Sequence, residues 1–194
     1  MRSPPLLLRW TLRKRSGAMS ERQSSLHETS GNISLRAWKQ DDAEALFPLA
    51  SAPAVGNAAG FPPHASIDES RRVIREILCK PETYAIVGRV DGKLLGCINL
   101  FSGQKGKSVY EVEEVNMGYW LGRPFWGHGI MAEAVGLLCE RCRASGQFRC
   151  AKVIGYAKES NVRSRRVLEK AGFNLVETSN GDCKYERALC RLPV

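Results

Sequence analysis

The sequence predicts one α/β domain built on a mixed sheet, together with a basic N-terminal extension. Three strand patterns follow one another with short turns between them, which is typical of antiparallel neighbours. A later strand-helix-strand unit indicates a parallel pair. The length of 194 residues, with 43% hydrophobic and 25% charged residues, fits one globular domain of ordinary size plus a tail. No apolar run approaches the roughly 18 residues that a membrane-spanning helix needs, so no membrane partner is predicted.

The first patterned segments are a strand and a helix. Residues 33–38 alternate apolar and polar side chains, as in a half-buried strand. Asp41 is expected to cap a helix that reaches about Ala50, with Glu44 three residues on as its partner in a capping box.

A loop and a second helix come next. Residues 51–64 are rich in Ala, Gly and Pro and are expected to form a loop. Ser66 and Glu69 form a second capping box, and the spacing of the apolar residues after it predicts a helix to about Lys80.

The period then changes to that of strands. Residues 84–90 and 93–101 are predicted strands, joined by Asp91-Gly92, which favours a two-residue hairpin. The remaining pattern is a loop at 102–108, a strand at 109–121, a Gly-rich turn at 122–129, a helix at 130–145, a strand at 152–157, a helix at 161–171 closed by Gly172, and strands at 173–178 and 184–192.

The net charge of +9 suggests a polyanionic partner, but five of the nine charges lie in residues 1–18, which contain no acid. Two interpretations of this tail stay open. In the first, the tail has no function of its own: it is a disordered arm, or it lies upstream of Met19 as the working initiator. In the second, it is functional, as a nucleic-acid-binding arm or an organelle signal. Because the rest of the chain lacks basic strands interleaved with aromatics or a helix-turn-helix, nucleic acid is disfavoured as a partner.

The seven cysteines show no regular spacing, which indicates a reducing, cytoplasmic compartment rather than a disulfide framework. Cys139 and Cys142 have the spacing of a zinc or redox motif. They fall inside a helical pattern, however, and no second Cys/His pair follows, so they are predicted core residues. No metal site is predicted.

A strand, a Gly-rich turn and a helix start meet at residues 119–131. Gly127 and Gly129 let the backbone approach an anion, and the helix N-terminus presents N–H groups to it. The spacing from Gly122 to Gly127 is that of a P-loop, but Lys-Ser/Thr does not follow. A dinucleotide fingerprint fits formally, but no acid follows about 20 residues later to hold a ribose.

A third phosphate motif is the acyl-coenzyme A loop of the GNAT N-acetyltransferase superfamily, Gln/Arg-x-x-Gly-x-Gly/Ala. Residues 124–129 resemble it, with Pro124 in the first position, a departure shared with the ribosomal-protein-alanine N-acetyltransferase subgroup. Three further segments are similar to that subgroup: Gly118-Tyr119-Trp120-Leu121, Gly60-Phe61-Pro62-Pro63-His64, and Asn161-x-x-Ser164 with Glu169-Lys170-Ala171-Gly172-Phe173. The resemblance covers about residues 33–192.

The resemblance implies the GNAT fold over residues 33–194, with residues 1–32 as a disordered extension. That fold has a central, mostly antiparallel sheet with a splayed parallel pair and helices on both faces. It also implies acetyl-coenzyme A (acetyl-CoA) as co-substrate, with the pyrophosphate on the turn, the pantetheine on the long strand and the thiol end beside the last helix. The residues implied in this binding are Met117, Tyr119, Leu121, Trp126, Gly127, His128, Gly129, Ile130, Met131, Asn161 and Ser164. Arg123, Arg163 and Arg166 are candidates for holding the outer phosphate.

Four residues are candidates for catalysis. The subgroup often has a Glu where Asn116 stands, and Asn cannot act as a base, so Glu114 on the same strand face is the expected proton acceptor. Many GNAT proteins have a Tyr acid at the position of Leu168. The subgroup's alternative, Ser164, is expected to protonate the leaving thiolate. Glu177 resembles a further carboxylate near the acceptor amine.

The expected function is acetyl transfer from acetyl-CoA to a primary amine, either a protein N-terminus or a small amine. The alternative is a GNAT-fold module that binds acyl-CoA without turnover, motivated by Asn116 and Leu168. The acceptor stays open, and so does the oligomeric state, a homodimer being one option.

Overall fold

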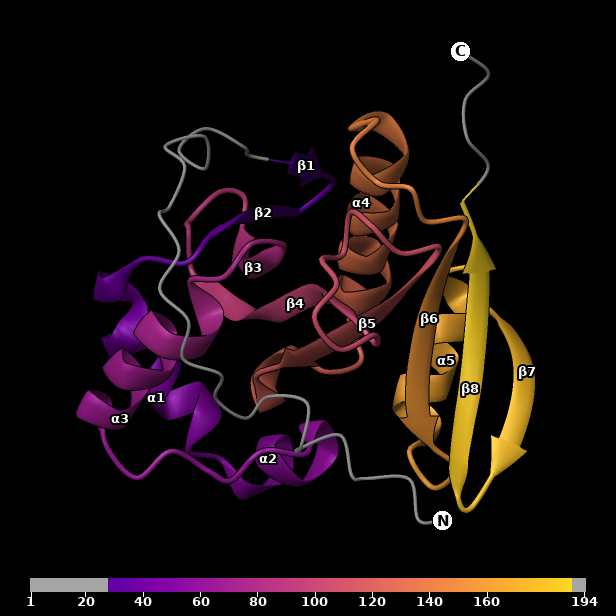
Figure 1. The fold of residues 1–194 in the computed structure, drawn as a ribbon. Helices are drawn as coiled ribbons and strands as arrows, with labels where there is room; N and C mark the ends of the chain where they lie inside the picture. The colour runs from indigo at the N-terminus through magenta and orange to yellow at the C-terminus, as the bar shows by residue number, and fades with distance from the viewer. Residues whose placement is uncertain (1–27, 190–194) are drawn as a thin grey trace.

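One eight-stranded sheet forms the centre of the computed structural model, which describes residues 28–189 (Figure 1). The strand order is β1-β2-β3-β4-β5-β6-β8-β7, and every neighbouring pair is antiparallel except β5 and β6. The strands are β1 Glu28–Ser30, β2 Ile33–Ala37, β3 Thr83–Gly88, β4 Leu94–Ser102, β5 Glu114–Leu121, β6 Lys152–Lys158, β7 Asn174–Ser179 and β8 Asp182–Ala188. The predicted mostly antiparallel sheet is confirmed.

Helices cover both faces of the sheet, as predicted (Figure 1). They are α1 Ala43–Ala50, α2 Pro53–Ala59, α3 Ile67–Val73 continuing into a π-helical stretch Ile74–Leu78, α4 Ile130–Ala144 and α5 Val162–Lys170. Because side chains alternate along a strand, β3 sends Ala85 into the core under α1–α3 and Ile86 into the core under α4 and α5. Leu168 of α5 belongs to this second core.

The parallel pair separates partway along its length. The β5–β6 pairing runs from Glu114 opposite Lys152 to Met117 opposite Gly155. Beyond that point β5 continues only alongside β4, and β6 only alongside β8. The opening after Met117, called the fork below, is the predicted splay.

The predicted helix starts at Ser66 and Asn161 are confirmed. Ser66 Oγ accepts a hydrogen bond from the Glu69 N–H at 3.1 Å, and Asn161 Oδ1 accepts one from the Ser164 N–H at 3.1 Å. Each side chain thus satisfies an N–H group that has no partner inside its helix.

The expected loop at residues 51–64 was wrong in its first half, which forms α2. Pro53 occupies the first turn of this helix, where its missing N–H costs nothing, and Gly60 ends it with a left-handed φ of 80°. The small residues between them gave no helical hydrophobic pattern, because only Val55 and Gly56 are buried.

The expected cap at Asp41 was also wrong. A 3-10 turn, Gln40–Asp42, precedes α1, and Asp42 accepts the Lys39 N–H at 2.9 Å while its carboxylate pairs with Arg36 at 2.7 Å. The carboxylate that caps this turn is therefore that of Asp42, which also pairs with Arg36 of β2 six residues earlier.

Two strand boundaries moved. The strand expected from residue 109 begins at Glu114, next to the end of its pairing with β4, and the segment before it is anchored by the hydroxyl of Tyr110, which donates to the buried carboxylate of Glu82 at 2.7 Å. The turn between β3 and β4 spans residues 89–93 rather than two residues, with a register shift between Ile86 and Val87.

The sheet starts earlier than residue 33. Strand β1 lies within the segment expected to be an extension, and it pairs with β2. The turn that joins the two strands contacts α4, because the Asn32 N–H donates to Glu133 Oε1 at 3.2 Å. The interpretations of the basic tail concern residues outside those that the structure describes.

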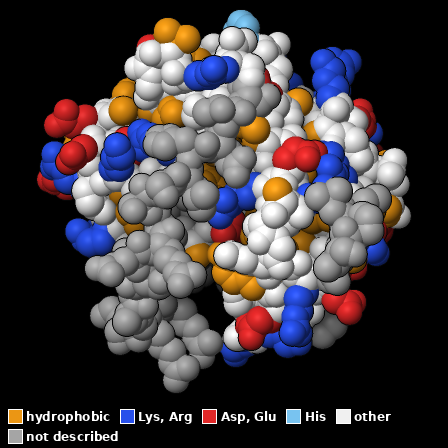
Figure 2. Space-filling model, turned by 90° about the horizontal axis from the view of Figure 1, so that it is seen from above, with side chains coloured by type: hydrophobic (Ala, Val, Ile, Leu, Met, Phe, Trp, Pro, Cys, Tyr) orange, Lys and Arg blue, Asp and Glu red, His pale blue; other side chains and the backbone are white. Residues whose placement is uncertain are grey.

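Basic and acidic side chains are interspersed over the face of the molecule seen in Figure 2. Within residues 28–189, no helix is long and apolar enough to cross a membrane. Cys139 and Cys142 lie in the core under α4, as predicted, and burial raises the pKa of the Cys139 thiol to about 11.

Candidate active site

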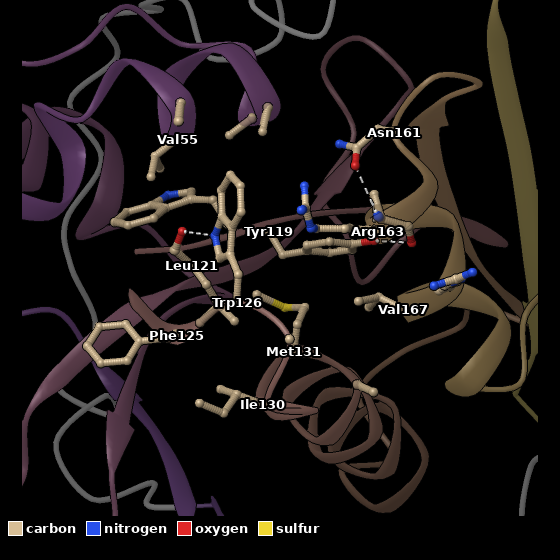
Figure 3. A pocket seen from close by; sticks show the side chains of 18 of the residues that line it. Val55, Tyr119, Leu121, Phe125, Trp126, Ile130, Met131, Asn161, Arg163 and Val167 are labelled. Carbon is tan, nitrogen blue, oxygen red and sulfur yellow. Dashed lines mark hydrogen bonds between the residues drawn. The ribbon is translucent and has the colours of Figure 1, made fainter. Parts of the chain in front are cut away.

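A cavity of about 680 Å³ opens at the fork, between α2 on one side and the first turns of α4 and α5 on the other (Figure 3). Sites of α/β sheets form where neighbouring strands diverge at their carboxyl ends, because helices and loops then surround an opening in the sheet. Most of the predicted binding residues line this cavity: Tyr119, Leu121, Trp126, Gly127, Gly129, Ile130, Met131, Asn161 and Ser164.

The glycine turn forms one end of the cavity. Gly127 and Gly129 have left-handed φ angles of 87° and 79°, and no heavy atom lies within 4 Å of where a Cβ would stand on either. The first hydrogen bond of α4 runs from the Glu133 N–H to the Gly129 carbonyl. The N–H groups of the preceding first-turn residues therefore have no acceptor inside the helix, and they form a site suited to an anion.

The edge of β5 forms the floor of the fork. Gly122 donates to Leu95 of β4 at 2.8 Å, so by strand alternation the backbone groups of Leu121, Tyr119 and Met117 point away from β4. Those of Met117 face β6, where Met117 lies opposite Gly155, whereas Tyr119 lies past the end of the pairing. An extended ligand with amide groups could pair with this edge as an added strand would.

Trp126 crosses the cavity from the glycine turn. Its indole N–H donates to the Leu121 carbonyl at 2.8 Å (Figure 3). The guanidinium carbons of Arg123 and Arg163 lie 4.8 and 5.6 Å from the centre of its ring. Trp126 therefore occupies the Leu121 carbonyl, which was expected to pair with pantetheine. Its ring also binds the guanidinium groups of Arg123 and Arg163 beside the turn.

The wall formed by α5 and the end of β6 is basic. Four cationic side chains line the cavity there, and no Asp or Glu is among the described residues that line it. They are Lys158, Arg163, Arg166 and Lys170. Arg163 and Arg166 were expected near a phosphate, whereas Lys158 and Lys170 had no sequence signal, because an isolated surface Lys resembles any other.

Tyr119 and Ser164 meet across the fork. The Tyr119 hydroxyl lies 2.9 Å from Ser164 Oγ and also donates to the Ser164 carbonyl at 3.3 Å. Burial raises the pKa of Tyr119 to about 12. Leu168, where many GNAT proteins have a Tyr, is fully buried against Gly155 of β6. The hydroxyl that reaches the start of α5 is therefore that of Tyr119 on β5, and not that of a Tyr at position 168. The sequence did not indicate this contact.

The two carboxylates proposed for catalysis lie away from this pair. Glu114 is half exposed at the start of β5, five residues or about 16 Å before Tyr119, and forms an ion pair with Lys152 at 3.5 Å. Glu177 is exposed on the edge strand β7, with β6 and β8 between it and β5. Neither residue lines the cavity.

The remaining candidates have mixed positions. Asn116 is buried on β5, on the sheet face that α1–α3 cover, just before the fork. Met117 is buried beneath the fork and His128 is exposed on the turn, and neither side chain lines the cavity. Five α2 residues with no predicted role line the opposite wall: Ala54, Val55, Asn57, Ala58 and Ala59.

Part of this chain is similar in sequence to a known protein. The chain is 33% identical over 102 residues to "Probable N-acetyltransferase YjcK" of Bacillus subtilis (strain 168), a match over 52% of this chain and 53% of that protein. The match thus spans about half the length of that relative.

Solved structures share the fold at low sequence identity. An acetyltransferase of the GNAT family from Bacillus anthracis has a TM-score of 0.69 at 13% identity, covering 84% of this chain and 98% of that one. Spermidine N-acetyltransferase from Vibrio cholerae, with CoA and spermine, has a TM-score of 0.65 at 13% identity, covering 82% and 97%. The model of the acetyltransferase (GNAT) domain matches residues 32–174, and with this match the chain belongs to the GNAT acetyltransferase family.

Proposed function

We propose that the chain transfers an acetyl group from acetyl-CoA to a primary amine. One observation carries this proposal: the glycine turn, the β5 edge beyond the fork and the Tyr119–Ser164 pair line a single cavity. An anion site, a strand edge and a hydroxyl pair in this order match the pyrophosphate, the amide-containing arm and the thioester of acetyl-CoA.

The residues present suit this substrate. The open cradle at Gly127 and Gly129 leaves room for the pyrophosphate against backbone N–H groups. The basic wall, from Lys158 to Lys170, complements the negative charges of the phosphates. The backbone of Tyr119, past the end of the β5–β6 pairing, is placed to bind the pantetheine arm.

The amine attacks the thioester carbonyl directly, forming the C–N bond as the C–S bond breaks. The sulfur leaves as a thiolate and takes a proton from the Ser164 hydroxyl, which Tyr119 supports at 2.9 Å. The attacking nitrogen loses one proton to solvent as the C–N bond forms, and solvent returns a proton to Ser164. Because Glu114 is ion-paired outside the cavity, we propose that the amine reaches the fork uncharged after losing a proton to solvent.

The charge of the cavity also bears on the acceptor. The spermidine N-acetyltransferase structure contains spermine, a polycation. Here the described lining has no carboxylate and four cations, of which Lys158 is paired with Asp182 at 2.8 Å. The other three would repel a second ammonium group unless the phosphates screened it. We therefore favour an acceptor with a single amine, such as a protein N-terminus, as the resemblance to the ribosomal-protein-alanine subgroup implies.

Two measurements test the proposal. Acetyl-CoA should raise the melting temperature because it binds the folded state alone. Thiol release with a panel of amines should then detect turnover, with N-terminal alanine peptides ahead of spermidine. A thermal shift without any thiol release would favour the binding module, and the absence of a shift would contradict both.

Ser164→Ala is expected to lower kcat by about 100-fold, because the leaving thiolate loses its proton donor. The thermal shift with acetyl-CoA should persist, since the glycine turn is untouched. Ser179→Ala on the exposed strand β7 is the matched control and should leave both quantities unchanged. An unchanged kcat in Ser164→Ala would show that Ser164 does not protonate the leaving thiolate.

The pH dependence follows from the same groups. The rate should rise with pH as the acceptor amine loses its proton and level off above the pKa of that amine, about 8 for an N-terminal α-amine. Burial raises the pKa of Tyr119 to about 12, so its hydroxyl keeps its proton throughout this range. A pH profile of kcat/KM should therefore show no alkaline decline up to about pH 10; a decline below pH 9 would implicate a different acid.

A further inference from the structure

The side chain of Asn99 occupies the start of the fork on the sheet face opposite Ser164. Asn99 of β4 lies directly opposite Gly118 of β5, the first residue past the end of the β5–β6 pairing. Its Oδ1 atom lies 2.7 Å from where a Cβ of Gly118 would stand. The missing side chain of Gly118 therefore makes room for this carboxamide oxygen.

This oxygen is buried and has no hydrogen-bond partner among the described residues. Asn99 is only 9% exposed, and Oδ1 is one of three buried polar side-chain atoms in residues 28–189 that lack a partner. A buried carbonyl oxygen without a donor is unfavourable. Asn99 does not itself line the cavity, but its oxygen lies against Gly118, the residue before the cavity-lining Tyr119, so a ligand in the fork is the nearest source of a donor.

The position separates Asn99 from the thiol end of acetyl-CoA. By strand alternation Asn99 shares a face with Cys97 and Trp120, which pack under α1–α3. Tyr119 packs against the other core, and its hydroxyl meets Ser164 there. A thioester lying in the fork would thus have its sulfur toward Ser164 and its other side toward Asn99, where an attacking group would approach.

A carbonyl oxygen can only accept a hydrogen bond, so its ligand must be an N–H or O–H donor. The phosphates and the thioester offer acceptors, and the amide N–H groups of the pantetheine arm are expected along the β5 edge, whereas the acceptor amine brings N–H groups to the far side of the thioester. We propose that Asn99 Oδ1 binds the primary amine of the acceptor and directs its lone pair toward the thioester carbonyl. This inference rests on the proposed function and adds the group that holds the nucleophile.

The step keeps its atoms in balance. One amine N–H donates to Asn99 Oδ1 while the nitrogen lone pair forms the new C–N bond. The C–S bond breaks, a proton leaves the nitrogen for solvent, the sulfur receives one from Ser164, and solvent returns a proton to Ser164. The carboxamide of Asn99 stays neutral throughout, so it orients the amine and takes no proton.

Asn99→Leu tests the assignment through the melting temperature, which should not fall, and kcat/KM for the amine, which should. The variant replaces an unpartnered polar group by hydrocarbon of similar size, so its melting temperature should equal or exceed that of the wild type. With a peptide bearing a free N-terminal alanine, and with hydroxylamine as a small second acceptor, kcat/KM for the amine should fall by at least about 30-fold. The thermal shift with acetyl-CoA should remain.

Two further variants sharpen the test. Gly118→Ala places a methyl group against Asn99 Oδ1 and should also lower kcat/KM for the amine while keeping the acetyl-CoA shift. Thr83→Val is the matched control, since Thr83 is buried opposite Asn99 on the side away from the fork, and it should leave kcat/KM unchanged.

Three results would overturn the assignment. Wild-type kcat/KM in Asn99→Leu would show that the oxygen does not hold the amine. Loss of the acetyl-CoA shift would make Asn99 a pantetheine contact, and a lower melting temperature with a parallel loss of all functions would make it a structural residue. If the proposed function itself is wrong, the wild-type protein will release no thiol with any amine, and this inference falls with it.

Discussion

Gly129→Val is expected to abolish the binding of acetyl-CoA and to lower kcat/KM by at least about 100-fold. Gly129 has a φ of 79° immediately before α4, a conformation that β-branched residues avoid. Its Cβ would also project into the open cradle where no protein atom lies within 4 Å. Thermal melting with and without acetyl-CoA measures the effect, and the ligand-induced shift should disappear.

Gly146→Val is the matched control, because Gly146 follows the other end of the same helix. It has a φ of 62° and equally open surroundings. Both variants should lose about 1–2 kcal/mol of stability from the left-handed backbone. Only Gly129→Val should lose the acetyl-CoA shift, and a normal shift in that variant would place the phosphates elsewhere.

Arg141→Ala is expected to lower the free energy of unfolding by about 3–5 kcal/mol. The carboxylate of Glu82 is buried, with 3% of its side chain exposed, and Arg141 of α4 lies 3.4 Å from it. The hydroxyls of Tyr84 and Tyr110 donate to the same carboxylate at 2.7 Å. Removing Arg141 would leave a buried negative charge without its cation, although the two hydroxyls remain.

Urea unfolding and thermal melting measure this loss, which corresponds to a fall in melting temperature of roughly 6–20 °C for a domain of this size. Arg143→Ala is the control, because Arg143 lies on the same helix and pairs with the exposed Glu140. That change should cost under about 1 kcal/mol. Equal effects in the two variants would show that the buried pair contributes no more than a surface one.

The Glu82 cluster also bears on the site. Tyr110 belongs to the segment before β5, and its bond to Glu82 anchors that segment. Glu82 itself has a φ of 56°, which is rare outside glycine and is kept here by its four side-chain contacts. The cluster thus supports the strand from which Tyr119 projects.

The site could be predicted where its signal is local in the chain. The glycines at 127 and 129, the helix start at Ile130 and the cap at Asn161 each depend on a few neighbouring residues, and all are found where expected. The antiparallel run and the parallel pair were also accessible, since short turns dictate antiparallel neighbours and the strand-helix-strand unit dictates a parallel pair. The place of β8 between β6 and β7 was not predicted.

The site could not be predicted where it depends on pairs of residues far apart in sequence. Glu114 was chosen because it shares a strand face with Asn116, but its distance from the fork depends on where β5 and β6 separate. Tyr119 was expected to contribute only its backbone, because its contact with Ser164 joins residues 45 positions apart. No role was predicted for Asn99, because a single polar residue in an apolar strand indicates a site only once the strand register places it beside Gly118.

The sequence by itself therefore determined the order of most elements, though not β1 or α2, together with the anion-binding turn and the resemblance to the GNAT family. The tertiary structure decided which side chains meet at the fork, what the buried carboxylate of Glu82 binds and which oxygen lacks a partner. The physical reason is that glycine conformations, caps and hydrophobic periods act over a few residues. Sheet register and helix packing, in contrast, bring together groups whose separation along the chain bears no relation to their distance in space.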